Sequence, residues 1–383
     1  MNTDINYINR DIEAKILKSF NKKMVLVLYG ARQTGKTTLI KKIFIKNNHN
    51  FLYLNCEEQR IREKLVPDYL ILKSLIGDNK NIIFDEAQRI KDPGLILKIL
   101  IDNDPNLNLV ASGSSSFDLA SKLNEPLTGR HFEFQLYPLS ISEISKETPT
   151  SDLDLTWKNT LLFGSYPKIF NQSGNIDKIN YLSILTSDYL YKDLLSFNLV
   201  RDSQKIHALL EALALQLGNE VSYNEIGTKL GLDNKTIERY IDLLEKSFVI
   251  FRLRTLSRNP RNELGKKVKI YFYDLGVRNS ILNNFSELRL RTDIGALFEN
   301  YFITEKIKSY QLANRKPNIY FWRTYSQKEI DFIEEIDGKI RGYEIKWSES
   351  KKINKNTKSE FFKSYPNATI ETVTPSNFQK YLG

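Results

Sequence analysis

One short stretch, residues 25–38, carries the clearest chemical pattern in the chain. It reads VLVLYGARQTGKTT: an apolar run, then Gly-x-x-x-x-Gly-Lys-Thr, then a segment of helical character. Glycines let a loop between a strand and a helix curl with its N–H groups turned inward toward an anion. The positive N-terminal end of the following helix favours the same anion. The pattern therefore predicts a loop that binds the phosphates of a nucleoside triphosphate.

The expected ligands of this loop are ATP and Mg²⁺. Lys36 would reach the β- and γ-phosphates, and the Thr37 hydroxyl would complete the Mg²⁺ shell. A glycine turn before a surface helix is the simpler alternative, but it leaves the acids described below unexplained. The residues expected to contact the nucleotide are Gly30, Ala31, Arg32, Gln33, Thr34, Gly35, Lys36, Thr37 and Thr38.

Two acids close a second apolar run. Residues 81–88 read NIIFDEAQ, with Asp85 and Glu86 at the end of a segment typical of a buried parallel strand. Asp85 is expected to hold Mg²⁺ directly or through water, and Glu86 to orient the attacking water. Acids also stabilise helix N-termini, but that does not explain why they close an apolar strand. Hydrolysis as well as binding is therefore expected.

Three further side chains are candidates for the same chemistry. The strand pattern at 106–116 contains Ser112 and Ser114 near its end, where either could contact the γ-phosphate or its water. Turn geometry explains these serines equally well. Arg130 could stabilise transition-state charge on the nucleotide of a neighbouring copy, which would require a homo-oligomer. A surface arginine is the commoner alternative.

A second group of acids lies near the C-terminus. The Asp-Gly pair at 337–338 predicts a two-residue hairpin turn, which pairs Ile336 with Lys339. In that register Asp331 lies opposite Glu344, since side chains alternate with a period of two. Facing carboxylates repel unless a cation lies between them. Oxygen ligands suit Mg²⁺, so a second Mg²⁺ site is possible here.

Two neighbours would complete this second site. Lys346 shares a face with Glu344 and could activate water for metal-assisted phosphodiester hydrolysis, and Glu299 on a preceding helix could be a third acid ligand. The alternative is a solvated face on which Lys346 pairs with Glu329. A slip of one residue would abolish the arrangement. The opposite face is expected to be apolar, with Ile330, Phe332, Tyr343 and Ile345.

Residues 221–256 predict a different unit. Ser222 and Glu225 form a capping-box pattern, a short helix ends at Gly231, and a longer helix and a strand follow. Helix, tight turn, helix and strand are the parts of a winged helix-turn-helix. The basic loop 258–269 favours DNA as a partner. A protein partner is at least as compatible with the exposed face of the second helix.

Length and composition limit the number of domains and the classes of protein to which the chain can belong. The 383 residues predict two or three domains. No run of about 18 apolar residues is present and the start lacks a secretory signal, so a cytoplasmic protein without a membrane span is expected. The only cysteine, Cys56, argues against disulfides and a Cys/His zinc site. The net charge of +10 favours a polyanionic partner, although a solvated basic surface accounts for it too.

The motifs and their order along the chain resemble those of a family of bacterial and archaeal AAA-type ATPases. These proteins join a P-loop domain to a C-terminal domain of uncharacterised function. The matching segments are GARQTGKTT and IIFDEAQ (Walker A and Walker B), LVASGSSS, LTGR with YPLS, GSYP, TIERYIDLLEKSFVIFRL, KIYFYDLGV, IDFI and YEIKWS. The resemblance implies an α/β chain with a three-layer parallel-sheet P-loop NTPase (AAA-like) core at 1–150. It further implies a helical lid or connector at 151–218, a winged helix-turn-helix at 219–260 and an α/β domain similar to PD-(D/E)xK restriction nucleases at 261–383.

The same resemblance assigns the C-terminal residues. Asp331, Glu344 and Lys346 stand at the nuclease motif positions, with Glu299 as the upstream helical acid; the bulky Trp347 that follows the lysine is a departure. One hypothesis is an ATPase that binds DNA and carries a metal-dependent nuclease. The alternative is an ATP-driven switch or scaffold whose nuclease-like domain is non-catalytic and binds DNA or a partner protein.

Overall fold

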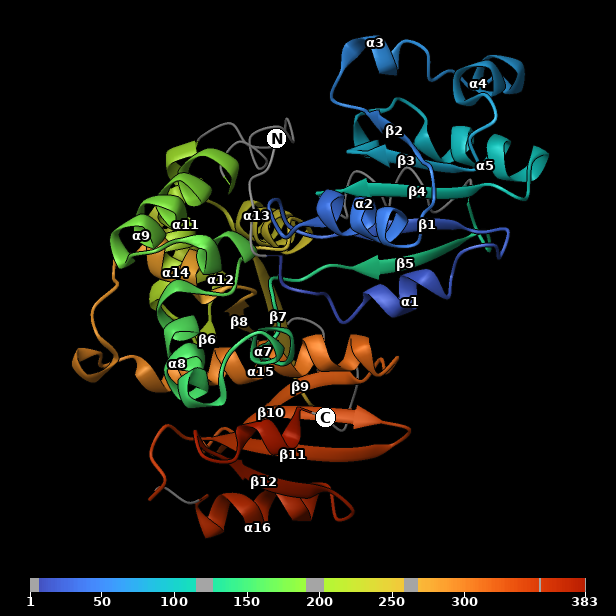
Figure 1. Ribbon diagram of the computed structural model, residues 1–383. Helices are drawn as coiled ribbons and strands as arrows, with labels where there is room; N and C mark the ends of the chain where they lie inside the picture. Colours follow the sequence, from blue (N-terminus) through green and yellow to red (C-terminus); the bar gives the residue numbers. More distant parts are fainter. Residues whose placement is uncertain (1–6, 115–126, 191–202, 258–267, 351–352, 383) are drawn as a thin grey trace. The chain divides into compact units, whose positions relative to one another are not determined.

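The computed structural model of the protein describes residues 7–114, 127–190, 203–257, 268–350 and 353–382 (Figure 1). Most of the basic loop 258–269 lies outside these residues. The chain divides into two compact units. The first comprises Met1–Leu139, Tyr166–Asn171 and Lys246–Phe248, and the second comprises Ser140–Ser165, Gln172–Glu245 and Val249–Gly383.

The first unit contains a five-stranded sheet of the order β2-β3-β4-β1-β5. Every pairing is parallel, which confirms the predicted parallel α/β sheet. The carboxyl ends of β1 and β3 therefore meet at one edge, the place where open parallel sheets bind ligands. The strands are β1 (Val25–Tyr29), β2 (Leu52–Asn55), β3 (Asn81–Asp85), β4 (Asn108–Gly113) and β5 (His131–Gln135).

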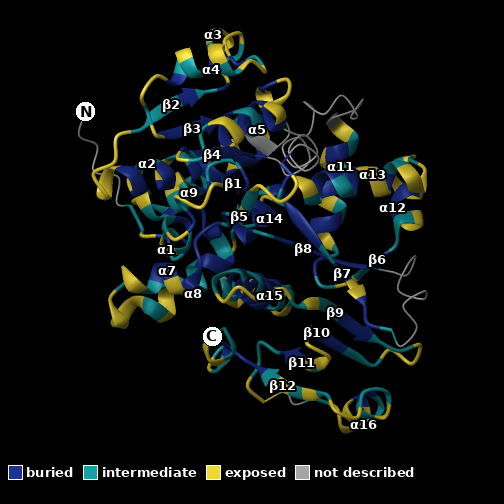
Figure 2. Ribbon diagram, turned by 90° about the vertical axis from the view of Figure 1, so that its right-hand side faces the viewer, coloured by how far each residue is buried: buried dark blue, intermediate teal, exposed yellow. Residues whose placement is uncertain are grey.

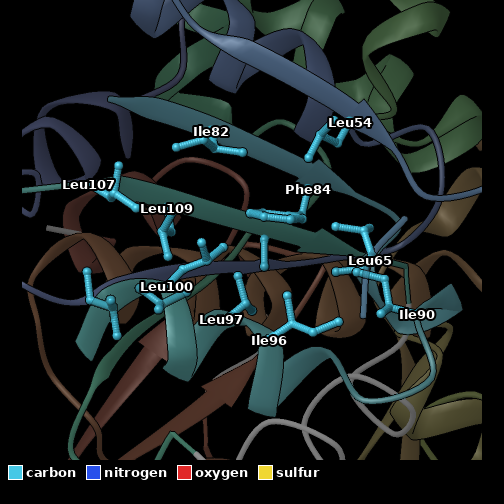
Figure 3. Packing of buried hydrophobic residues seen from close by; sticks show 14 of the residues in the cluster. Leu54, Leu65, Ile82, Phe84, Ile90, Ile96, Leu97, Leu100, Leu107 and Leu109 are labelled. Carbon is cyan, nitrogen blue, oxygen red and sulfur yellow. The ribbon is translucent and has the colours of Figure 1, made fainter. Parts of the chain in front are cut away.

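Helices cover both faces of this sheet, so β1 and β3 are buried along their whole length (Figure 2). On one face, Ile96, Leu97 and Leu100 of α5 pack under Phe84 and Leu109 of the sheet (Figure 3). Burial on both faces explains why the strands are continuous apolar runs. The helices are α1 (Glu13–Leu17), α2 (Lys36–Lys46), α3 (Gln59–Arg62), α4 (Tyr69–Ile76), α5 (Pro93–Asn103) and the 3-10 turn η1 (Ala87–Arg89).

The second unit is built on a seven-stranded sheet of the order β12-β11-β10-β9-β7-β8-β6. Its strands are β6 (Glu220–Val221), β7 (Ile250–Thr255), β8 (Val268–Phe272), β9 (Asn318–Arg323), β10 (Glu329–Ile336), β11 (Lys339–Ile345) and β12 (Thr369–Val373). Its helices are α7 (Ile141–Lys146), α8 (Leu153–Phe163), α9 (Asn175–Ile184), α11 (Ser203–Leu215), α12 (Tyr223–Leu230), α13 (Asn234–Lys246), α14 (Leu275–Ile281), α15 (Ile294–Leu312) and α16 (Lys355–Ser364).

The expected boundary between residues 260 and 261 falls inside this sheet. β7 pairs antiparallel with β8, with Ile250 opposite Phe272, and parallel with β9, with Arg254 opposite Tyr320. Strands β6–β8 therefore share one sheet with the C-terminal strands. The sequence pattern predicts a strand where β7 lies, but it does not show that this strand joins two groups of strands.

Helix α15 is buried on every side, from Leu297 to Tyr310. A helix covered all round has no solvent-facing stripe, and its charged side chains are instead paired internally. The sequence patterns left α16 and β12 unassigned, although β12 pairs parallel with β11 and completes the edge of the sheet.

Within the second unit, Gly164 and Ser165 of the GSYP motif pack against the YDLG motif. Asp274 caps α14 by accepting from Val277 N (3.1 Å), and its other oxygen accepts from Ser165 N (2.7 Å). Gly276 lies directly against the end of α8: a Cβ atom there would stand 2.2 Å from the carbonyl oxygen of Phe163. A backbone atom cannot swing aside, so only glycine fits. These two motifs therefore have a packing role.

We predict that Gly276→Ala destabilises the second unit by about 2 kcal/mol or more, because the added methyl group overlaps a backbone carbonyl. Gly295→Ala is the matched control, since nothing lies within 4 Å of its Cβ position in α15. Alanine there should be neutral or stabilise by up to about 1 kcal/mol. Urea unfolding measures both changes. Equal stability of the two variants would contradict the packing role.

Candidate functional site

At one position in the loop between β1 and α2, the backbone lies too close to its neighbours to leave room for a side chain. Gly30 has φ 156°, and a Cβ atom on it would lie 2.3 Å from the carbonyl oxygen of Leu136. Gln33 (φ 63°) and Gly35 (φ 93°) are left-handed, and Gly35 directly precedes the first residue of α2. The loop is thus held curled at the carboxyl end of β1, as the glycine spacing predicts.

The Lys36 side chain bends back over this loop. Only 5% of the residue is exposed, and its Nζ donates to the carbonyl oxygens of Gly30 (2.8 Å) and Ala31 (2.9 Å). Thr34 Oγ1 donates to the same Ala31 oxygen (2.9 Å). A buried ammonium group needs such acceptors. The loop therefore keeps its cation in place through its own carbonyl groups.

Arg10 is a loop contact that the sequence patterns missed. The residue is 7% exposed, and its guanidinium donates to the carbonyl oxygens of Thr34 (2.9 Å) and Tyr137 (2.7 Å). It thereby ties the phosphate loop to the segment that follows β5. A single arginine upstream of the motif, with no regular spacing to it, offers no sequence signal of this contact.

Asp85 is the point where the two sequence motifs meet. Its carboxylate accepts from Thr37 Oγ1 (2.8 and 3.0 Å), from Tyr53 Oη (2.6 Å) and from Ser112 Oγ. The structure thus brings together Thr37 and Asp85, which the sequence assigned to one Mg²⁺ site. Ser112 binds this carboxylate, so its hydroxyl has a structural partner. Tyr53, which lies two residues before the end of β2, was not identified from the sequence.

Glu86 has a strained backbone and a defined partner. Its φ of 55° and ψ of 45° place it in the left-handed region, which is uncommon for a residue with a side chain and typical of functional sites. Gln88 donates to Glu86 Oε2 (2.5 Å) and to Ser114 Oγ (3.2 Å). Gln88 therefore connects the candidate water-orienting acid to one of the two candidate serines. Its role was not predicted.

Arg130 lies at the amino ends of the strands, opposite the carboxyl ends where the phosphate loop lies. It immediately precedes β5, whose first residue, His131, pairs with Val25 at the start of β1, whereas the phosphate loop follows Tyr29 at the end of β1. Five strand residues separate these edges by roughly 16 Å. Arg130 is partly exposed and its Nε donates to Asp102 (2.9 Å). It therefore lies too far away to act on a nucleotide in its own loop.

The other loop residues are at the surface of the site. Arg32 lies 3.8 Å from Glu57 in an ion pair, and Thr38 is exposed on the first turn of α2. Neither approaches Asp85 in the described contacts.

The C-terminal hairpin has the predicted register. Ile336 pairs with Lys339 and Phe332 with Tyr343, so Asp331 and Glu344 follow at the next position. Asp331 Oδ2 accepts from the backbone N–H of Ile345 (2.7 Å), which holds this carboxylate against β11.

The prediction that Ile330 shares an apolar face with Phe332 and Tyr343 is wrong. The pairing of β10 with β9 shifts register between Ile330 and Ile333. Ile330 therefore packs with Ile333 and Phe361, whereas Phe332 lies against Tyr343. A bulge of this kind adds a residue to one strand and reverses the alternation beyond it.

Two lysines lie among the acids of this hairpin. Lys346 Nζ is 2.8 Å from Glu344 Oε1 and 3.4 Å from Asp331 Oδ2, so the expected alternative partner, Glu329, is not its partner. Lys269 of β8, which the sequence did not single out, is 1% exposed in its side chain. Its Nζ lies 3.1 Å from Glu299 and 2.5 Å from Glu329.

Glu299 and Glu329 have further partners. Tyr271 Oη donates to Glu299 Oε1 (2.5 Å), and Arg323 lies 3.2 Å from Glu329 and 3.4 Å from Glu220. Glu299 is thus held by groups of β8. In the described part of the chain, no set of three or more His, Cys, Asp or Glu side chains is arranged to hold a metal ion.

The cluster has an imbalance of charge. The connected ion pairs join five carboxylates to three cations, a formal excess of two negative charges. The acids are Glu220, Glu299, Glu329, Asp331 and Glu344, and the cations are Lys269, Arg323 and Lys346. Burial, together with the neighbouring Asp331 carboxylate, raises the pKa of Glu344 to about 7. Burial is also the main cause that raises the pKa of Glu299 to about 7. The Oε2 atom of Glu344 is buried and has no hydrogen-bond partner among the described residues.

Trp347 packs away from this charge cluster. Its ring lies 6.1 Å from that of Trp157 and 5.8 Å from that of Phe298. The departure from the family motif thus serves an aromatic core. Elsewhere in the second unit, Asn234, Lys235, Glu238 and Arg239 are exposed on α13, and Ser222 Oγ accepts from Glu225 N at the start of α12 (3.4 Å).

The raised pKa values predict a pH dependence of stability. A glutamate with its usual pKa of 4.5 in the unfolded chain and about 7 in the folded chain stabilises the fold fully below pH 4.5. That contribution is lost as the pH rises through about 7. We expect the unfolding temperature to fall between pH 5 and 8, and to fall less in Glu344→Gln, which stays neutral.

Glu335→Gln, on the same strand, is the matched control and should keep the wild-type slope. Thermal unfolding followed by circular dichroism across this range measures all three proteins. An identical slope in wild type and Glu344→Gln would contradict the assignment.

One comparison with known proteins covers the part of the chain that contains the phosphate loop and Asp85. Residues 22–145 match a family model described as an AAA domain. Residues 154–288 and 294–378 match two domains of unknown function, DUF8612 and DUF4143. The walker-type ATPase PABY2304 of Pyrococcus abyssi has a similar fold, with a TM-score of 0.51 and 15% identity over 73% of this chain and 97% of that one. The family model thus supports an AAA-type domain over residues 22–145, and the structural similarity supports its fold.

Two uncharacterized proteins are similar along most of the chain. Rv2008c of Mycobacterium tuberculosis is 27% identical over 354 residues, which cover 91% of this chain and 76% of that protein. MJ1544 of Methanocaldococcus jannaschii is 27% identical over 350 residues, which cover 85% of this chain and 74% of that protein. None of the described helices is both long and apolar enough to cross a membrane.

Proposed function

We propose that this protein binds ATP and hydrolyses it with Mg²⁺, as an AAA-type ATPase. The observation that carries the proposal is the meeting of Lys36, Thr37 and Asp85 at one edge of a parallel sheet, with Thr37 Oγ1 2.8 Å from Asp85. A cation, a hydroxyl and a carboxylate are the groups that a nucleoside triphosphate and its metal need.

The oxygen atoms around Asp85 fit Mg²⁺. The ion prefers hard oxygen ligands and keeps several waters, so it needs few protein groups. Thr37 would bind it directly and Asp85 would hold it directly or through water. When bound with ATP, the ion supplies positive charge to the phosphate oxygens as the bond to the γ-phosphate breaks.

The chain's own residues supply binding and orientation. Lys36 would exchange the carbonyl oxygens of Gly30 and Ala31 for phosphate oxygens, a replacement of weak acceptors by charged ones. Glu86 would orient the attacking water, and Gln88 and Ser114 would keep the Glu86 carboxylate in position. Arg10 would maintain the shape of the loop through Thr34.

Lys36→Ala should reduce ATP affinity by at least tenfold, because the loop loses its cation. Glu86→Gln should keep ATP affinity and lower turnover by about a hundredfold or more, because only the orientation of water is lost. Lys46→Ala is the control: it lies on the same helix, and its side chain is 68% exposed. Binding of a fluorescent ATP analogue and release of phosphate measure the two effects. Unchanged turnover in Lys36→Ala would contradict the proposal.

The position of Arg130 supports action between copies of the chain. It cannot approach its own phosphate loop, and its exposure leaves it accessible from outside the unit. We therefore propose that Arg130 completes the site of a neighbouring copy in a homo-oligomer. Its bond to Asp102 would break on assembly.

For the second unit we propose a nucleic-acid-binding role. The order α11-β6-α12-α13-β7-β8, with β6 and β7 both antiparallel to β8, supports interpretation as a winged helix. The net charge of +10 and the exposed Lys235 and Arg239 favour DNA. A protein partner on the same face is the alternative.

A second Mg²⁺-dependent activity, nuclease cleavage, has one specific observation in its favour. Glu344 Oε2 is buried without a partner in a cluster with two excess negative charges, which a divalent cation would neutralise. Against it, Lys269 and Tyr271 already hold Glu299, so only Asp331 and Glu344 remain as ligands. The alternative is a non-catalytic domain stabilised by its internal lysines.

We expect Mg²⁺-dependent cleavage of DNA by the wild-type protein to be lost in Asp331→Asn. Asp337→Asn is the control, because Asp337 lies in the exposed hairpin turn at φ 51°, a conformation that asparagine adopts equally well. Gel assays with and without EDTA measure cleavage. Equal cleavage by wild type and Asp331→Asn would exclude this site, and no cleavage by any of the proteins would favour the non-catalytic alternative.

A further inference from the structure

We propose that Tyr53 is a positioning residue for the metal-holding carboxylate of Asp85, and that Lys41 fixes the Tyr53 ring for this purpose. The inference rests on the proposed ATPase function. It adds two residues outside both sequence motifs to the site.

The position of Tyr53 follows from the sheet. β2 pairs in parallel with β3, with Tyr53 opposite Ile83 and Asn55 opposite Asp85. Side chains alternate along a strand, and Leu54 belongs to the buried cluster on the α5 side. Tyr53 therefore lies on the α2 side, where its hydroxyl donates to Asp85 Oδ2 over 2.6 Å.

Helix α2 holds the ring from the other side. Lys41 Nζ lies 3.4 Å from the centroid of the Tyr53 ring, a cation–π contact. Lys41 follows Thr37 by four residues, so both side chains lie on one face of α2. Thr37 and Tyr53 thus donate to the same carboxylate, while Lys41 limits the motion of the tyrosine ring.

The three hydroxyl groups that donate to the Asp85 carboxylate differ in whether they must stay there when Mg²⁺ binds. A carboxylate accepts about four hydrogen bonds, and Asp85 has donors in Thr37, Ser112 and Tyr53. If Thr37 turns its hydroxyl toward Mg²⁺, Ser112 and Tyr53 remain to fix the carboxylate. They bond different oxygens, Oδ1 and Oδ2, so together they set the plane of the group.

The tyrosine remains a donor under ordinary conditions. Burial, with the adjacent Asp85 carboxylate, raises the pKa of the Tyr53 hydroxyl above its usual range. The group therefore keeps its proton and orients Asp85 without taking part in proton transfer. Its loss should weaken the metal-dependent part of nucleotide binding and leave the metal-independent part unchanged.

The experiment compares wild type with Tyr53→Phe in binding a fluorescent ATP analogue, first in EDTA and then over a Mg²⁺ titration. We expect affinity in EDTA to stay within about twofold of wild type. The gain in affinity on adding Mg²⁺ should fall about tenfold, the effect of one hydrogen bond to a charged group. In turnover assays with Mg²⁺, the KM for ATP should rise by a similar factor, because KM follows affinity when hydrolysis is slow.

Two further variants make the result specific. Tyr29→Phe is the matched control, since it removes another strand hydroxyl in the same sheet, one that contacts Glu133 at 3.5 Å, and it should bind as wild type. Lys41→Met keeps most of the side chain and should reduce the Mg²⁺ gain about two- to threefold. It also tests the proposal if Tyr53→Phe is too unstable to purify.

An unchanged Mg²⁺ gain in Tyr53→Phe, or in Lys41→Met where only that variant folds, would overturn the positioning role. So would a loss of affinity that is equal with and without Mg²⁺, since that indicates general damage to the fold. If wild type binds no nucleotide under either condition, the proposed ATPase function fails and this inference fails with it. Nucleotide binding by wild type therefore separates the two failures.

Discussion

The first unit depends on one constraint: buried charged groups must have partners before any ligand arrives. Lys36 is 5% exposed and satisfies its ammonium group with two loop carbonyls, and Asp85 satisfies its carboxylate with hydroxyl groups from α2, β2 and β4. An unpaired charge in such surroundings would cost several kcal/mol. The phosphate loop is therefore preorganised, and each internal bond has an acceptor or donor that ATP or Mg²⁺ can replace.

Much of this site could be predicted from the sequence because its parts are local. The glycine spacing identifies the loop, an apolar run ending in two acids identifies Asp85 and Glu86, and the parallel sheet brings strand ends to one edge. Arg10, Tyr53 and Gln88 could not be found this way. Each acts through side-chain hydrogen bonds to another segment of the chain, and no regular spacing accompanies such contacts.

In the second unit too, local features could be predicted from the sequence and contacts between distant segments could not. The Asp-Gly turn at 337–338 was sufficient to predict the β10–β11 register, because a two-residue hairpin leaves one pairing. It could not predict the bulge beside Ile330 or the presence of Lys269 among the acids. Lys269 comes from β8, and the parallel pairing of β7 with β9 that joins the two groups of strands has no local signature. The buried lysine explains why Glu299 pairs with an ammonium group.

ATP and Mg²⁺ should replace bonds that the phosphate loop makes with itself. A crystal structure with a non-hydrolysable ATP analogue and Mg²⁺ tests this replacement most directly. We expect Lys36 Nζ to leave the carbonyl oxygens of Gly30 and Ala31 for phosphate oxygens, and Thr37 Oγ1 to leave Asp85 for the metal. Tyr53 should still contact Asp85. Nucleotide bound elsewhere, or bound here while Lys36 remains on the loop carbonyls, would show that this replacement does not occur.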